Sequence, residues 1–324
     1  MSVGSTELMQ EIDVDVLHRD AATGGLGGGE PRGMDEQHQR RLHAHGAERH
    51  ANVPPRPRTG ALPVTNTIAF MTANYVARET GYAMHGWDHG DRLTNEAFAP
   101  LETYGERLDA LLADVATLGF DTIDLWGAHL GPEWATDAHV EEALAGLARH
   151  GLRVATYATW IGPSNVERVC ELTRALGASV IGGGFSGEPE MIAPALTRHG
   201  VRLGIENHPE RTPAEVLAKI DHGDGAFGAT VDTGWWGTQG YDAAQAIDEL
   251  GDHLLHVHLK DVLAVGEPHD TCRWGDGIVP IEQCVRTLRR LGYDGAIAVE
   301  HEPETFDPSD DVRTMREQLE GWLA

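Results

Sequence analysis

The sequence has no apolar run long enough to cross a membrane. A transmembrane helix needs about 20 consecutive apolar residues, and no run of even 18 occurs in the 324 residues. The first residues also lack the apolar segment of a signal peptide. We therefore expect a soluble, cytoplasmic protein that does not act at a membrane.

Basic residues are scarce, with 25 Lys and Arg against 51 Asp and Glu, for a formal net charge of −26. A phosphodiester backbone is repelled by such a surface, and no basic stripe offsets the charge locally. Cysteine is rare too, and Cys170, Cys272 and Cys284 show no CxxC spacing. The sequence predicts no nucleic-acid partner and three reduced, structural thiols.

Large apolar residues are few in the first 65 positions. This part has a glycine-rich stretch at 24–29, a His/Arg/Gln-rich run at 37–50 and a Pro/Arg motif at 54–58. Without a periodic apolar face it cannot bury enough surface to offset its chain entropy. We expect residues 1–65 to be a disordered N-terminal extension with solvated histidines. A translation start placed too far upstream would give the same pattern.

The remaining 259 residues alternate short apolar runs with stretches of helical period. The runs lie at about 67–73, 121–126, 153–158, 178–183, 201–206, 228–232, 254–258 and 296–300. A helix is predicted from Arg107 to Leu118, where apolar residues recur every three or four positions before Gly119. Eight strand–helix units imply parallel pairing. They match the roughly 250 residues of a closed barrel. We predict an α/β fold, a (β/α)8 TIM barrel over residues 66–324, with an open doubly wound sheet as the alternative.

Four ionisable residues each lie at the carboxyl end of a predicted strand. Glu206, Asp232, His258 and Glu300 follow one another at spacings of 26, 26 and 42 residues. Strand ends meet at one rim of a barrel, where active sites form. Three carboxylates and one imidazole make a hard donor set, which suits Mn²⁺ first and also Mg²⁺ or Co²⁺, rather than zinc. The sequence predicts one divalent metal ion as the cofactor.

Four ligands would leave positions open for two vicinal oxygens of a sugar. The ion would polarise the carbonyl and stabilise an enediolate. Glu206 and Glu300 would approach from opposite sides, and each could keep one oxygen free to move a proton. We predict that these two glutamates are catalytic as well as metal-binding.

Five strings carry a family resemblance: Ile205-Glu-Asn-His-Pro-Glu210, Val231-Asp-Thr-Gly-Trp235, His256-Val-His-Leu-Lys-Asp261, Gly275-Asp-Gly-Ile-Val-Pro-Ile281 and Val299-Glu-His-Glu302. They resemble the xylose-isomerase-like TIM barrel superfamily, in its sugar phosphate isomerase/epimerase branch, over about residues 66–324. The resemblance implies the same four metal ligands, with the glutamates as the acid/base pair. It also implies a homo-oligomer or a small partner subunit.

The sequence departs from that family at one place. Many relatives have histidine after Asp-x-Gly, where this chain has Trp235 and Trp236. In the endonuclease IV branch that histidine binds a second metal, and in several epimerases it contacts the substrate. Its absence weakens the prediction of a multi-zinc nuclease and of a direct copy of a known epimerase.

Two further residues are catalytic candidates. His208 and Lys260 each lie two positions beyond a predicted ligand, so they point to the same side. Lys260 would neutralise an oxyanion, or pair with Asp261 or Glu210; His208 would act as an auxiliary acid, or steady Glu206. His256 is expected to face the helices as a buried core histidine.

Eight tryptophans are many for this length, and most lie at strand ends or in the loops that follow. Aromatic faces pack against sugar rings and flat aglycones, although rim packing explains any single tryptophan. The residues predicted to bind substrate are Trp126, His129, Trp160, Trp235, Lys260 and Arg273.

We predict a metal-dependent sugar isomerase or epimerase that abstracts a proton α to a carbonyl of a small carbohydrate. The main alternative is a lyase or dehydratase that expels a β-substituent from a keto-sugar or a 3-keto-glycoside, including a C-glycoside. An endonuclease IV-like nuclease and a barrel that only binds ligands are the more remote alternatives.

Overall fold

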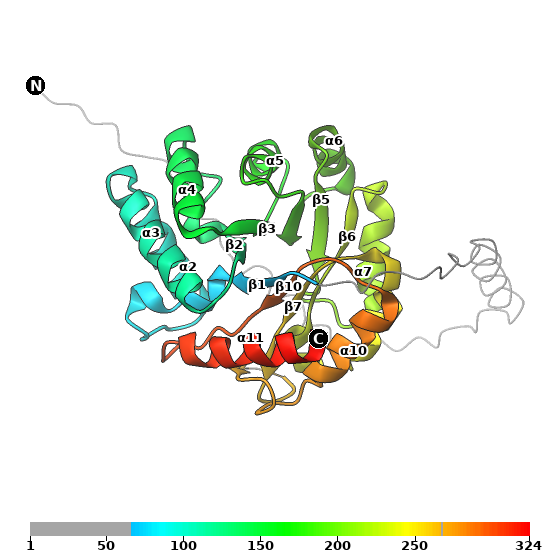
Figure 1. Cartoon of the computed structure of the whole chain (residues 1–324). Coiled ribbons are helices and arrows are strands. Elements are labelled where there is room, and N and C mark those ends of the chain that lie inside the picture. The colour runs from blue at the N-terminus through cyan, green and yellow to red at the C-terminus, as the bar shows by residue number, and fades with distance from the viewer. Residues whose placement is uncertain (1–65, 267) are drawn as a thin grey trace, which may run out of the picture. The chain divides into compact units, whose positions relative to one another are not determined.

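The computed structural model describes residues 66–266 and 268–324, and in them eight parallel strands close into a barrel (Figure 1). Around the barrel their order is β1, β10, β7, β6, β5, β4, β3 and β2. Their bounds are β1 (Ile68–Met71), β2 (Thr122–Trp126), β3 (Arg153–Ala158), β4 (Val180–Gly183), β5 (Arg202–Glu206), β6 (Phe227–Asp232), β7 (Leu254–Leu259) and β10 (Ile297–Val299). The predicted (β/α)8 fold is confirmed, and closure excludes the doubly wound alternative. The predicted extension over residues 1–65 lies outside the described residues.

Helices surround the strands (Figure 1). They are α2 (Trp87–Phe98), α3 (Leu101–Thr117), α4 (Asp137–His150), α5 (Val166–Ala175), α6 (Pro189–His199), α7 (Pro213–Ile220), α8 (Thr233–Thr238), α9 (Ala243–Leu250), α10 (Ile281–Leu291) and α11 (Ser309–Leu323), with short 3-10 turns η2 (Thr72–Tyr75), η3 (Arg78–Thr80), η4 (Gly127–His129), η5 (Asp221–Gly223) and η6 (Gly251–His253). The helix predicted from Arg107 is the second half of α3. Gly151 and Gly292 end α4 and α10 with φ of 66° and 72°, a conformation that favours glycine.

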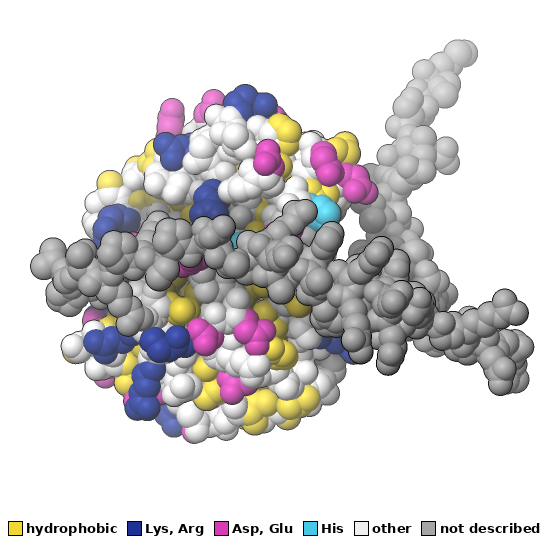
Figure 2. Space-filling model, turned by 90° about the vertical axis from the view of Figure 1, so that its right-hand side faces the viewer, with side chains coloured by type: hydrophobic (Ala, Val, Ile, Leu, Met, Phe, Trp, Pro, Cys, Tyr) yellow, Lys and Arg dark blue, Asp and Glu magenta, His cyan; other side chains and the backbone are white. Residues whose placement is uncertain are grey.

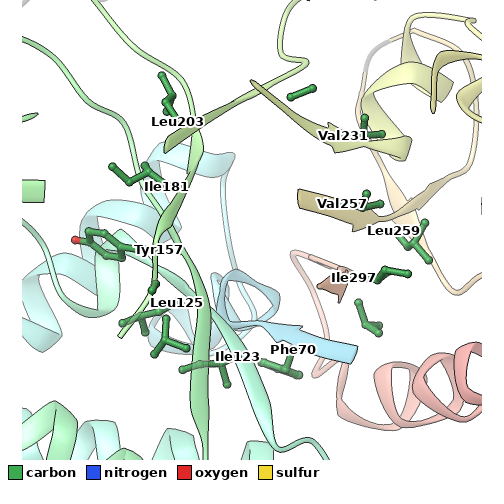
Figure 3. Packing of buried hydrophobic residues seen from close by; sticks show 14 of the residues in the cluster. Phe70, Ile123, Leu125, Tyr157, Ile181, Leu203, Val231, Val257, Leu259 and Ile297 are labelled. Carbon is green, nitrogen blue, oxygen red and sulfur yellow. The ribbon is translucent and has the colours of Figure 1, made fainter. Parts of the chain in front are cut away.

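The larger part of the core lies between the barrel and its helices. Figure 3 labels members of this cluster from all eight strands: Phe70, Ile123, Leu125, Tyr157, Ile181, Leu203, Val231, Val257, Leu259 and Ile297. Their buried side chains come from the outward-facing positions of the strands. Successive residues of a strand point to opposite faces, so the residues between them face the barrel interior.

The barrel interior is filled by a smaller apolar cluster and by polar residues. Ala69, Met71, Trp126, Ala158 and Ala298 belong to the apolar part. Glycine makes room for the polar part: a Cβ on Gly204 would lie 2.2 Å from Oγ1 of Thr230 on the next strand. The pairing also shifts register between Ile123 and Asp124, and between Ala229 and Thr230.

A two-stranded antiparallel sheet, β8 (Asp261–Val262) with β9 (Thr271–Cys272), follows β7. The buried carboxylate of Asp261 holds this region together by accepting hydrogen bonds from four backbone amides, at residues 262, 275, 277 and 279. Cys170, Cys272 and Cys284 are buried and form no disulfide.

Within the described ranges, no helix is long and apolar enough to cross a membrane. On the uncovered part of the face in Figure 2, acidic side chains lie among the basic ones.

Candidate metal centre

The structure brings Glu206, Asp232, His258 and Glu300 together at the carboxyl end of the barrel. One potential ligand atom from each lies within 4.8 Å of the others. Glu206 and Asp232 are the last residues of β5 and β6, His258 is the fifth residue of β7, and Glu300 follows β10 directly. Asp232, His258 and Glu300 are buried, whereas a quarter of the Glu206 side chain is exposed. The cluster therefore opens to solvent beside Glu206.

Backbone contacts fix the direction of Asp232. The side chain of Asn207 accepts a hydrogen bond from the backbone amide of Asp232 at 2.7 Å and donates one to its carbonyl at 2.9 Å. These bonds connect the ends of β5 and β6. Oδ1 of Asp232 caps α8 by accepting from the amides of Gly234 and Trp235. One oxygen is thereby used by the helix, and Oδ2 is left for the cluster.

Lys260 lies among the carboxylates. Its Nζ is 2.9 Å from Asp232, 3.1 Å from Glu300 and 2.9 Å from Glu302, and the side chain is buried. Neither Asp261 nor Glu210, the partners considered from the sequence, pairs with it. Glu210 pairs with Lys219. The reason is that Lys260, directly after β7, points to the same side as His258, two residues earlier.

The charges of this cluster shift several pKa values. Burial alone would lower the pKa of Lys260, but the carboxylates of Asp232, Glu300 and Glu302 raise it well above its usual range. Burial raises the pKa of Asp232 to about 6, against the opposing effect of Lys260. Burial also raises the pKa of Glu302 well above its usual range. These carboxylates are crowded, and one ammonium does not compensate all of them.

Two oxygens of the cluster are buried without accepting a hydrogen bond. Oδ2 of Asp232 lies 2.9 Å from Nζ of Lys260, and Oε2 of Glu300 lies 3.1 Å from Nδ1 of His258, but neither contact has hydrogen-bond geometry. Buried carboxylate oxygens are normally paired or bound to a metal ion. The donor set, with two oxygens that accept no hydrogen bond, therefore fits a divalent cation.

A second buried layer lies beneath His258. Nδ1 of His258 is 2.9 Å from Glu206 in the cluster, and Nε2 of His258 is 2.8 Å from Oδ2 of Asp124 in the layer below. The same Oδ2 is 2.6 Å from Nε2 of His256. The expectation that His256 faces the helices is wrong, because residues two apart on a strand share a face. Asp124 was not predicted, although a lone carboxylate inside Thr122–Trp126 was an available signal.

Three aromatic rings stack beside the cluster. The ring of Trp235 lies 4.0 Å from that of His208 and 3.9 Å from that of His269, at interplanar angles of 27° and 8°. Two imidazoles cannot both approach one ring so closely on the same face without overlapping, so they cover opposite faces. The role of Trp235 in binding a substrate stays a prediction. His269 was not predicted, because nothing in its local sequence marks it.

The xylose isomerase-like TIM barrel model matches residues 112–324. The chain belongs to this family. Among curated proteins, an uncharacterized protein of Methanocaldococcus jannaschii is 26% identical over 133 residues. That match covers 38% of this chain and 44% of the relative, so it spans less than half of the relative's length.

Several solved structures share the fold of this family member. A xylose isomerase-like TIM barrel protein from Mycobacterium smegmatis in complex with magnesium has a TM-score of 0.58 at 18% identity, over 82% of this chain and 98% of that chain. The probable 3-DHS dehydratase AsbF from Bacillus anthracis gives 0.58 at 14% identity, over 78% and 98%. D-Allulose 3-epimerase from Methylomonas sp. in complex with D-allulose gives 0.54 at 16% identity, over 82% and 100%.

Three other residues predicted to bind substrate, Trp126, His129 and Trp160, differ in how far they are exposed. Trp160 is 55% exposed, and its ring lies against Gly184. Trp126 is buried against Trp87, and beside it Nδ1 of the buried His129 lies 3.1 Å from Oγ1 of Thr72. Burial lowers the pKa of His129 to about 3. Of these residues, Trp160 has the most open surface.

Arg273 lies outside the cluster. It pairs with Asp276 at 3.3 Å and approaches Asp311 at 3.9 Å. Among the described residues it forms no ion pair with the four-residue cluster. Its role in binding a substrate stays a prediction.

Proposed function

We propose that this protein is a divalent-metal-dependent sugar isomerase or epimerase that abstracts a proton from a carbon next to a carbonyl. One observation carries the proposal. Three carboxylates and an imidazole converge at the carboxyl end of the barrel, and two carboxylate oxygens there are buried and accept no hydrogen bond. Glu206, Asp232, His258 and Glu300 would hold Mn²⁺, with Mg²⁺ or Co²⁺ as alternatives.

A divalent ion at this position would act as a Lewis acid on the carbonyl of the substrate. The protein would supply the proton transfers. Glu206 lies at the open side of the cluster and Glu300 at its buried side, and both approach Nδ1 of His258, at 2.9 and 3.1 Å. Two carboxylates on different sides of one carbon could remove a proton and return it on the other face or at the neighbouring carbon.

Lys260 would stabilise the negative charge that develops on the substrate oxygen. It is buried and charged beside Asp232 and Glu300, two of the predicted ligands, and a fixed charge there is the kind that stabilises a developing oxyanion. His208 stacks on Trp235, which favours a positioning role beside Glu206 over an acid role.

One observation favours a lyase as a second candidate. Trp160, in the loop after β3, exposes more than half of its side chain, and an exposed indole offers a face for an aromatic or bulky β-substituent. The same proton abstraction would then lead to expulsion of that substituent from a keto-sugar or a 3-keto-glycoside.

Solvent deuterium exchange tests both candidates. The Mn²⁺-loaded protein would be incubated in D₂O with D-allulose, D-fructose and a 3-keto-D-glucoside carrying an aryl group, followed by NMR. We expect deuterium at one carbon next to the carbonyl, and no exchange after the metal is removed with EDTA. Release of the aryl group would select the lyase. Absence of exchange and of release with every sugar would contradict the proposal.

A further inference from the structure

His269 stacks beside the candidate metal centre, from a loop that carries none of the predicted ligands. It lies between β8 and β9, and its ring packs on Trp235, which follows β6. His208, which follows β5, covers the other face of Trp235. Segments after three neighbouring strands therefore meet in one stack beside the cluster.

The orientation of the His269 ring is fixed. Its Nδ1 lies 2.6 Å from Oγ1 of Thr238, the last residue of α8. The same residue is tied to the loop through its carbonyl, which accepts from the amide of Gly266 at 2.8 Å. Because the two nitrogens lie on opposite sides of an imidazole, Nε2 points away from Thr238.

That second nitrogen is buried and forms no hydrogen bond with any described residue. A buried polar atom without a partner has lost its hydrogen bonds to water and gained none in return, so native proteins rarely leave one unpaired. Burial lowers the pKa of His269 to about 3, with Lys260 lowering it further and Glu300 opposing. The ring is therefore neutral, and it lies within reach of the charges of the centre.

We propose that Nε2 of His269 binds an oxygen of the carbohydrate substrate and so positions the part of the sugar that does not react. The assignment rests on the proposed function. His269 would be a positioning residue, because its nitrogen would hold a hydroxyl group while the glutamates move the proton. The unpaired nitrogen would then gain its hydrogen bond only when the substrate is bound.

The test uses the Mn²⁺-loaded full chain and the sugar that exchanges deuterium. His269→Phe keeps a flat ring on Trp235 but removes both nitrogens. Loss of one hydrogen bond should raise KM about 3- to 10-fold, while kcat and Mn²⁺ affinity change less than about twofold. His269→Asn, which keeps a hydrogen-bonding group, should recover part of the loss. His222→Phe, at an exposed histidine of η5, is the matched control.

A deoxy analogue of the sugar, which lacks the hydroxyl group that His269 would bind, should have the same affinity for the wild-type protein and for His269→Phe. If both His269 variants kept the wild-type KM, His269 would have a structural role only and the inference would be overturned. If His269→Phe failed to fold, His269→Asn would decide alone. Failure of the proposed function would be visible separately, as a wild-type enzyme that exchanges no proton, and the inference would fall with it.

Discussion

Nε2 of His258 and Oδ2 of Asp124 lie 2.8 Å apart in the barrel interior, beneath the cluster of carboxylates. A carboxylate on the far nitrogen of a histidine fixes the ring and its tautomer, and makes the near nitrogen a better metal ligand. Asp124 is fully buried and is itself held by His256. The two histidines of His256-Val-His258 therefore have different tasks: one faces the candidate site, and the other anchors the carboxylate behind it.

Replacing Asp124 should weaken metal binding without removing any ligand. Asp124→Asn keeps the shape but loses the charge behind His258, and we expect Mn²⁺ affinity to fall about 10- to 100-fold, as for comparable supporting residues. Isothermal titration calorimetry with Mn²⁺ measures the affinity of both proteins. Asp121→Asn, at an exposed position three residues earlier, is the control. An Asp124→Asn protein with wild-type affinity would show that Asp124 only fills the barrel.

Lys260 should stabilise the metal-free protein. Lys260→Met removes the ammonium that pairs with three buried carboxylates, and breaking a buried ion pair costs about 3–5 kcal/mol. Bound Mn²⁺ would restore positive charge, so the variant should gain more in Tm from Mn²⁺ than wild type does. Calorimetry with EDTA and with Mn²⁺ makes the comparison, with the exposed Arg286→Met as control. An unchanged Tm in EDTA would contradict the prediction.

The two glutamates should differ from Asp232 in their response to metal. Glu206→Gln and Glu300→Gln keep an amide oxygen as a ligand but cannot move a proton, so we expect losses at the upper end of about 10²–10⁴-fold or beyond in kcat. Asp232→Asn should act chiefly through metal affinity and recover in part with excess Mn²⁺. Measuring the activity of the three variants as a function of Mn²⁺ concentration separates a loss of proton transfer from a loss of metal affinity. Full recovery of the glutamine variants would reassign proton transfer to His208 and Lys260.

Residues 1–60 should be dispensable, because their sequence has no periodic apolar face. We expect the shortened protein to keep its activity and to melt within a few degrees of the full chain. Calorimetry on both forms is the measurement. A larger fall in Tm would place the beginning of the folded domain before Asn66.

The sequence by itself determined the strand–helix order and the positions of the four predicted ligands. Both depend on local patterns: apolar runs, helical period, and a charged residue where each of four runs ends. Parallel strands bring their carboxyl ends to one rim, so Glu206 and Glu300 could be expected together although 94 residues separate them.

Only the tertiary structure decided which side chains meet inside the barrel. Asp124 contacts His256 and His258, which are more than 130 residues away in the sequence. Lys260 forms an ion pair with Glu302 and not with Asp261. His269 stacks on Trp235. These contacts depend on closure of the barrel and on the register of its strands, which shifts beside Asp124 and Thr230. Local periodicity carries no information about that register, because it is set by how the whole ring of strands packs.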